Sequence, residues 1–87
     1  MKIENDLLSG VSTIRMIGRF QSEHVEELKK QVQNGPRLVL DLKQVTIVDV
    51  DVVRFLGASE ADGVKLVHCP RYIREWMRRE GFSHDHR

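Results

Sequence analysis

The sequence predicts a small α/β fold in which helices pack on a mostly parallel sheet. First, residues 11–20, VSTIRMIGRF, alternate apolar and polar side chains, which is the period of a half-buried strand. Second, residues 37–42, RLVLDL, are almost continuously apolar, as expected of a central parallel strand covered on both faces. Third, segments with helical spacing alternate with strand-like segments after residue 21, and parallel strands need such helical crossovers.

The first 20 residues are predicted to form an antiparallel hairpin. A short strand, KIENDLL, is followed by Ser9 and Gly10, a pair typical of tight turns. In the second strand, Ile14, Met16 and Phe20 fall on one side, so that side is expected to meet the core.

A helix is predicted to begin after the hairpin, with Ser22 as its N-cap. Val25, Leu28 and Val32 then share one face. Asn34-Gly35-Pro36 is expected to end this helix, because Gly accepts the left-handed capping conformation and Pro cannot continue a helix.

Two further helices and one strand complete the predicted order ββαβαβα. The first of these two helices follows the 37–42 strand after a short excursion. The second is preceded by Pro70, a residue well suited to a helix start. The predicted segments are a helix over 51–62 ending at Gly63, a strand over 64–69, and a helix over 71–80 ending at Gly81.

At 87 residues the chain is expected to form one domain over 1–87, with 81–87 as a flexible tail. It has no run of the roughly 20 apolar residues that a membrane span needs. The N-terminus lacks a signal-peptide pattern, and a single cysteine, Cys69, cannot form an internal disulfide. A cytoplasmic location is therefore expected.

Charge is distributed unevenly along the chain. The net charge of +1 argues against nucleic acid as a partner. Residues 65–87 contain six Lys or Arg against three Asp or Glu, whereas residues 1–64 contain eight against ten. The last quarter of the chain is therefore basic and the remainder slightly acidic.

Two aspartates interrupt the apolar run VTIVDVDVVRFLG at residues 45–57. A buried carboxylate without a partner is costly, so the placement of Asp49 and Asp51 requires an explanation. One explanation is structural: carboxylates at a helix start accept hydrogen bonds from free N–H groups and complement the helix dipole, and Asp49 is the better candidate for the N-cap. The other explanation is a role in binding.

The pattern LVLDL-x-x-V-T-x-V-D-x-x-x-V-x-x-L over 38–56 resembles the signature of STAS domains. This family contains the anti-anti-sigma factors of bacterial partner-switching systems and cytoplasmic modules of sulfate transporters. Its signature strand is followed by an Asp-Ser-Ser/Thr-Gly-Leu turn, in which a partner anti-sigma kinase phosphorylates the second hydroxyl residue. If Asp49 is aligned with the family aspartate, the resemblance places the phosphoacceptor position at Asp51.

The chain departs from the family pattern in ways that affect switching. Val50 and Val52 replace the usual Ser and Gly, and Asp51 has no hydroxyl group to phosphorylate. A carboxylate carries about −1 charge, against about −1.5 to −2 for a phosphoserine, so Asp51 is at best a partial mimic. The chain also lacks the family's last strand and helix, which favours a homo-oligomer or an obligatory partner. Phosphorylation elsewhere, at Thr46 or Ser59, is left open.

The resemblance implies a non-enzymatic regulatory module that resembles an anti-sigma factor antagonist. Its partner, an anti-sigma factor or related kinase, would bind at the start of the 51–62 helix. The candidate partner-binding residues are Asp49, Asp51, Val52, Val53 and Arg54. The alternative is an accessory subunit of a lipid- or anion-transport complex, with a transporter ATPase as its partner and without membrane insertion of this chain.

The last predicted helix carries an arginine stripe, Arg71, Arg74 and Arg78, beside an apolar face of Ile73, Trp76 and Met77. One interpretation is an amphipathic helix with a solvated basic face. The other is a basic docking surface for an acidic protein, a membrane surface or RNA, although the arginines are too few to favour nucleic acid over protein.

No cofactor, metal site or catalytic group is predicted. His68-Cys69 is interpreted as a strand end, and His84-Asp85-His86 lies in the predicted tail. The chain has no Gly-rich phosphate loop, and capping explains its one acid pair without catalysis.

Overall fold

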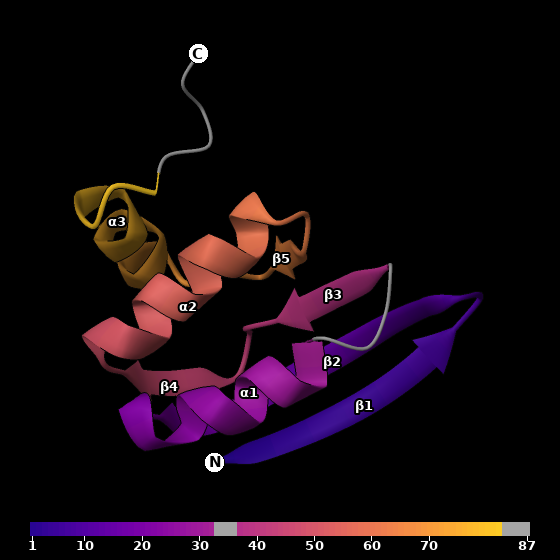
Figure 1. Ribbon diagram of the computed structural model, residues 1–87. Coiled ribbons are helices and arrows are strands. Elements are labelled where there is room, and N and C mark those ends of the chain that lie inside the picture. Colours follow the sequence, from indigo (N-terminus) through magenta and orange to yellow (C-terminus); the bar gives the residue numbers. More distant parts are fainter. Residues whose placement is uncertain (33–36, 83–87) are drawn as a thin grey trace.

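The computed structural model describes residues 1–32 and 37–82, in which helices pack against a mixed sheet (Figure 1). The predicted α/β class, with mostly parallel strands, is confirmed. The elements, in chain order, are β1 (Lys2–Leu8), β2 (Val11–Phe20), the 3₁₀ turn η1 (Ser22–His24), α1 (Val25–Val32), β3 (Leu38–Asp41), β4 (Val45–Val48), α2 (Val50–Ala61), β5 (Lys65–Val67) and α3 (Arg71–Arg79).

The opening hairpin is confirmed, with β1 and β2 antiparallel and Leu8 opposite Val11. Its two turn residues, Ser9 and Gly10, have φ angles of 54° and 80°. A two-residue hairpin turn with φ positive at both positions matches the right-handed twist of its strands. Ser9-Gly10 therefore fixes the register of the first strand pair.

β2 is the central strand of the described sheet because it pairs on both sides. Its first half pairs in parallel with β3, from Ser12 opposite Leu38 to Arg15 opposite Asp41. Its second half pairs in parallel with β4, after a register irregularity between Gly18 and Arg19. The strand order is β1-β2-β3-β5, with β4 joined to β2 beyond the end of β3.

β4 was not predicted, because the sequence indicated only a short excursion between the 37–42 strand and the 51–62 helix. The four residues of β4 are buried only at Val45 and Val48, whereas Thr46 and Ile47 are exposed. Buried positions three residues apart do not give the period of two by which a strand is recognised. Pairing with β2, rather than local alternation, makes this segment a strand.

Helices cover one face of the sheet and leave the other less protected. In β3, Leu38 and Leu40 are buried, while Val39 and Asp41 are only partly buried. The expectation of a strand covered on both faces was therefore wrong. The core forms where the inward side chains of β2 and β3 meet those of the helices: Ile14, Met16, Phe20, Leu28, Leu38, Leu40, Leu42, Val45, Val48, Val52, Val53, Leu56, Ile73 and Met77.

The first helix begins later than predicted. Gln21, not Ser22, caps η1, and the α-helical hydrogen bonding begins only at Val25. The stop signal at residues 34–36 lies outside the described residues. No helix in the described ranges is both long and apolar enough to span a membrane.

The last helix ends in contact with α2. Gly81 has a φ of 98°, and the N–H of Phe82 donates to the carbonyl of Met77 at 2.9 Å, which closes the end of α3. Phe82 then packs over Gly57 of α2. Residues 81 and 82, which the sequence assigned to a flexible tail, thus close α3 and contact α2, and residues 83–87 lie outside the described residues.

Candidate functional site

Asp49 is the N-cap of α2, as the sequence predicted. Its Oδ1 accepts a hydrogen bond from the Val52 N–H at 3.1 Å, which satisfies one of the free donors at the helix start. Its Oδ2 accepts from the Ser22 N–H at 2.6 Å. One carboxylate therefore joins the start of α2 to the start of η1, two segments that lie 27 residues apart in the chain.

The hydrogen bonds also favour the charged form of Asp49. Burial acts to raise its pKa, but the N–H groups of Ser22 and Val52 lower it further than burial raises it. The pKa of Asp49 is therefore below its ordinary value of 3.8, and this carboxylate is ionised at neutral pH.

Asp51 has a different environment, although it is only two residues further along. It lies in the first turn of α2 and is exposed. Its side chain lines a groove of about 400 Å³ between α2 and the η1–α1 segment. The lining residues of this α1–α2 groove are Ser22, Val25, Glu26, Lys29, Asp51, Arg54 and Phe55.

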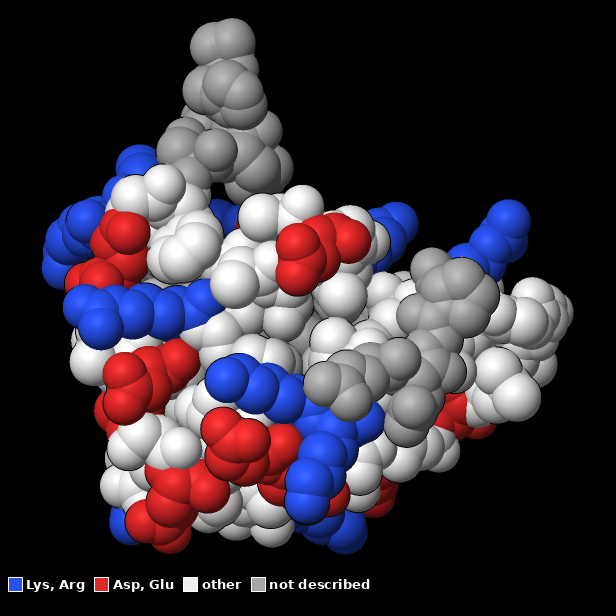
Figure 2. Space-filling view, viewed as in Figure 1, with Lys and Arg blue, Asp and Glu red and all other residues white. Residues whose placement is uncertain are grey.

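The α1–α2 groove combines charge with an apolar continuation. Figure 2 shows acidic side chains gathered over η1, α1 and the first turns of α2, with basic side chains between them. Lys29 and Phe55 also line a second hollow of about 220 Å³, which continues between the two helices toward Val32, Ala58 and Val64. The surface around Asp51 is therefore polar, and it becomes apolar along α2.

The structure corrects the assignment of Val52 and Val53 to the partner-binding surface. Both side chains are 0% exposed and belong to the core, together with Leu56 on the same inner face of α2. The sequence could not show this, because valines both before and after Asp51 hide which face of the helix points inward. Arg54 is exposed, and its Nε donates to Glu80 Oε1 at 2.8 Å.

The predicted arginine stripe of α3 is divided in the structure. The Arg74 Nη1 donates to Glu60 Oε1 at 2.7 Å, and both side chains are largely buried, so Arg74 joins α3 to α2. Arg71 and Arg78 are exposed. Arg74 is thus not available as the centre of a basic docking surface, and no pattern in the sequence indicated its pairing with Glu60.

Among the described residues, the remaining sequence candidates do not form a second site. Ser59 is only 6% exposed, so a kinase could not reach it in the folded protein, whereas Thr46 is exposed. His68 Nδ1 lies 3.2 Å from Asp41 Oδ1, but nowhere in residues 1–32 and 37–82 do three metal-binding side chains come together. Burial raises the pKa of the half-buried Cys69 thiol. His84, Asp85 and His86 lie outside the described residues.

Comparison with known proteins shows a similarity in structure. No protein-family model and no curated protein matches the chain. Among solved structures, it is similar to the anti-sigma factor antagonist SpoIIAA in its unphosphorylated form. The TM-score is 0.66 and the identity 15%, over 93% of this chain and 82% of that one. At this identity the similarity shows the fold, and the protein therefore has the STAS-like fold that its 38–56 pattern predicted.

Proposed function

We propose that this protein is a non-enzymatic regulatory module that binds a protein partner at the α1–α2 groove. The observation that carries the proposal is the separation of the two carboxylates. Both oxygens of Asp49 accept backbone hydrogen bonds, whereas Asp51 is exposed in the groove. An exposed acid at a helix start is worth only about 0.3–1 kcal/mol to stability, which leaves Asp51 free to serve binding.

The lining of the groove indicates what kind of partner fits. Asp51 and Glu26 offer negative charge beside the cations Lys29 and Arg54, and Phe55 offers apolar surface in the same groove. A partner segment with a basic side chain for Asp51 and an apolar side chain for Phe55 would satisfy both. Charge of this kind contributes mainly to the choice of partner and to the association rate.

The charge at position 51 is permanent, so phosphorylation of this residue cannot regulate binding. In the STAS family, the equivalent hydroxyl residue is phosphorylated by the anti-sigma kinase, and only the unphosphorylated form binds that kinase. Asp51 cannot lose its charge through a phosphatase. If the protein imitates the phosphorylated, released form, it does not bind the kinase of the family, so a partner captured at this groove is one whose site accepts a carboxylate at position 51. Phosphorylation at position 51 therefore cannot turn the binding of this protein on or off.

The alternative partner is the ATPase of a membrane transport complex, to which the protein would attach as an accessory subunit. The observation in its favour is that Asp51 replaces the switching serine, while Arg71 and Arg78 expose positive charge on α3. The identity of a captured partner separates the two functions: an anti-sigma factor or kinase supports the first, and a transporter ATPase supports the second.

Capture from a native lysate is the experiment that tests the site. We expect the Asp51→Lys variant to lose at least about 90% of the partner that the wild-type protein retains, because reversing the charge replaces attraction with repulsion. Wild-type capture should also weaken when the ionic strength is raised.

The matched control is Glu75→Lys, which makes the same change of charge on an exposed residue of α3. We expect this variant to capture the partner as the wild-type protein does. Equal capture by wild type and Asp51→Lys, with both proteins folded by circular dichroism, would remove the α1–α2 groove from the binding mechanism.

A further inference from the structure

The first strand leaves one edge of the sheet open. Strand β1 is at the end of the order β1-β2-β3-β5, and within the described residues it pairs only with β2 (Figure 1). It is seven residues long, with Ile3 and Glu4 half-buried and the rest exposed. An edge of this length presents a row of free N–H and C=O groups that can pair with another strand.

The two faces of β1 carry different side chains. Lys2, Glu4 and Asp6 share one face. On this face, Arg15 Nε of β2 lies 3.5 Å from Glu4 Oε1, and Arg15 Nη2 lies 3.9 Å from Asp6 Oδ2. The other face carries Ile3, Asn5 and Leu7.

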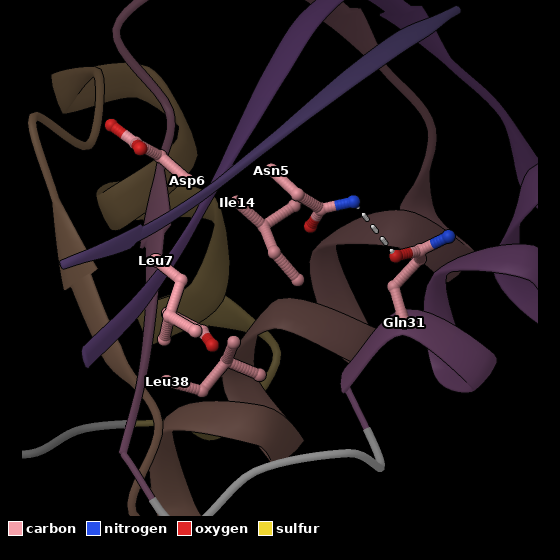
Figure 3. Close-up of a pocket in the computed structure, with 7 residues that line it drawn as sticks. Asn5, Asp6, Leu7, Ile14, Gln31 and Leu38 are labelled. Atoms are coloured by element: carbon pink, nitrogen blue, oxygen red, sulfur yellow. Dashed lines mark hydrogen bonds between the residues drawn. The ribbon is translucent and has the colours of Figure 1, made fainter. Parts of the chain in front are cut away.

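Asn5 orients this second face toward α1. Its Nδ2 donates to Gln31 Oε1 at 3.3 Å (Figure 3). Leu7 borders a hollow of about 330 Å³ beneath the strand and is 70% exposed, and Met1 at the other end of the strand is 51% exposed. The protein's own described residues therefore leave two large apolar side chains, Met1 and Leu7, uncovered on this face of the edge.

We propose that β1 pairs with β1 of a second copy of this chain, antiparallel and centred on Glu4, to join the two sheets into one. In this register Lys2 of each copy lies opposite Asp6 of the other, and Met1 lies opposite Leu7. Directly opposite residues are within contact distance in an antiparallel pair. The pairing thus covers the exposed apolar residues on one face and matches opposite charges on the other.

Charge complementarity selects this register over its neighbours. The one unfavourable pair is Glu4 opposite Glu4, and each Glu4 is already next to an Arg15 guanidinium and the Lys2 ammonium of its own copy. A shift of two residues one way places Glu4 opposite Asp6 twice. A shift the other way places Lys2 opposite Glu4 but leaves Asp6 and Leu7 unpaired. Like charges directly opposite are destabilising. Of these registers, only the Glu4-centred one places an opposite charge across from both Lys2 and Asp6.

Sedimentation velocity of the wild-type chain is the first measurement. We expect the sedimentation coefficient to rise with concentration, from that of a 10.1 kDa monomer to that of a dimer, over a series extending to about 1 mM, where weak interfaces become populated. A coefficient that stays at the monomer value throughout the series overturns the proposal.

Charge variants then test the register itself. Lys2→Glu and Asp6→Lys each replace the two attractive pairs with repulsive ones, so each variant alone should remain monomeric. An equimolar mixture restores the attraction at both pairs and should recover the dimer. Glu75→Lys, which changes an exposed charge on α3, should dimerise as the wild type does.

The outcome of the mixing experiment is decisive in both directions. Recovery of the dimer requires position 2 of one copy to face position 6 of the other, as the Glu4-centred register places them. Dimers in either single variant, or a mixture that stays monomeric, contradict this register. Circular dichroism of each variant confirms that its secondary structure is unchanged, and the strand ends are exposed enough for these substitutions to be tolerated.

Discussion

Replacing Asp49 with alanine is expected to lower the free energy of unfolding by about 2 kcal/mol, at the upper end of what an N-cap contributes. The reason is that the carboxylate serves two segments at once, because it accepts from Val52 in its own helix and from Ser22 at the start of η1. Urea unfolding followed by circular dichroism measures the change. The control is Asp51→Ala in the same helical turn, for which we expect a loss of less than about 1 kcal/mol. Equal losses would contradict the division of roles between the two aspartates.

The stabilisation by Asp49 should also depend on pH in a defined direction. Burial acts against ionisation, but the backbone N–H groups of Ser22 and Val52 keep the pKa below its ordinary value of 3.8. A carboxyl group that is more acidic when folded stabilises the protein fully above its unfolded pKa, and this contribution disappears as the pH falls through the folded value. The difference in unfolding free energy between wild type and Asp49→Asn should therefore be constant at pH values more than about one unit above 3.8. It should narrow as the pH falls further. A gap that persists at the lowest pH would show that the charge is not responsible.

Gly57→Ala is expected to destabilise the protein by about 1–3 kcal/mol, the usual cost of overpacking a core. A Cβ atom at this buried position of α2 would come within 2.6 Å of the Phe82 ring atoms Cγ and Cδ2, so Phe82 must move from the end of α3. Elsewhere in a helix the same substitution is favourable by up to about 1 kcal/mol. The sign of the effect therefore depends on Phe82.

A double-mutant comparison tests that dependence. With Phe82 already replaced by alanine, adding Gly57→Ala should stabilise the protein, because the ring that it would displace is absent and the helix propensity of alanine remains. Urea unfolding of the four proteins gives the coupling between the two positions. If Gly57→Ala destabilises both backgrounds equally, Phe82 is not the reason for the glycine.

The parts of the fold that could be predicted are those determined by local sequence. The Ser9-Gly10 turn, the cap at Asp49 and the punctuation by Gly63 and Gly81 depend on the conformations of single residues, and the structure confirms them. The parts that could not be predicted depend on distant partners. β4 is a strand because β2 pairs with it, and Arg74 is withdrawn from the surface because Glu60 is 14 residues away in sequence but adjacent in space.

The candidate site, like the fold, could be predicted only where local sequence determines it. The sequence singled out the segment around Asp49 and Asp51 and correctly gave Asp49 the capping role. It could not separate Val52 and Val53, which are fully buried, from the exposed Asp51 and Arg54, because the inner face of α2 is determined by packing against the sheet and the other helices. The α1–α2 groove depends on how two helices meet, and no sequence pattern indicated Phe55 or Lys29 as part of it.

The most direct test of the proposed binding site is a titration of the captured partner with the wild-type protein and the Asp51→Ser variant. Serine is the residue that STAS proteins usually carry at this position, and it removes the charge without adding bulk. We expect the variant to unfold at the same urea concentration within error and to change its affinity for the partner by at least about fivefold, or about 1 kcal/mol. An unchanged affinity in a folded Asp51→Ser variant would show that Asp51 has no part in recognition.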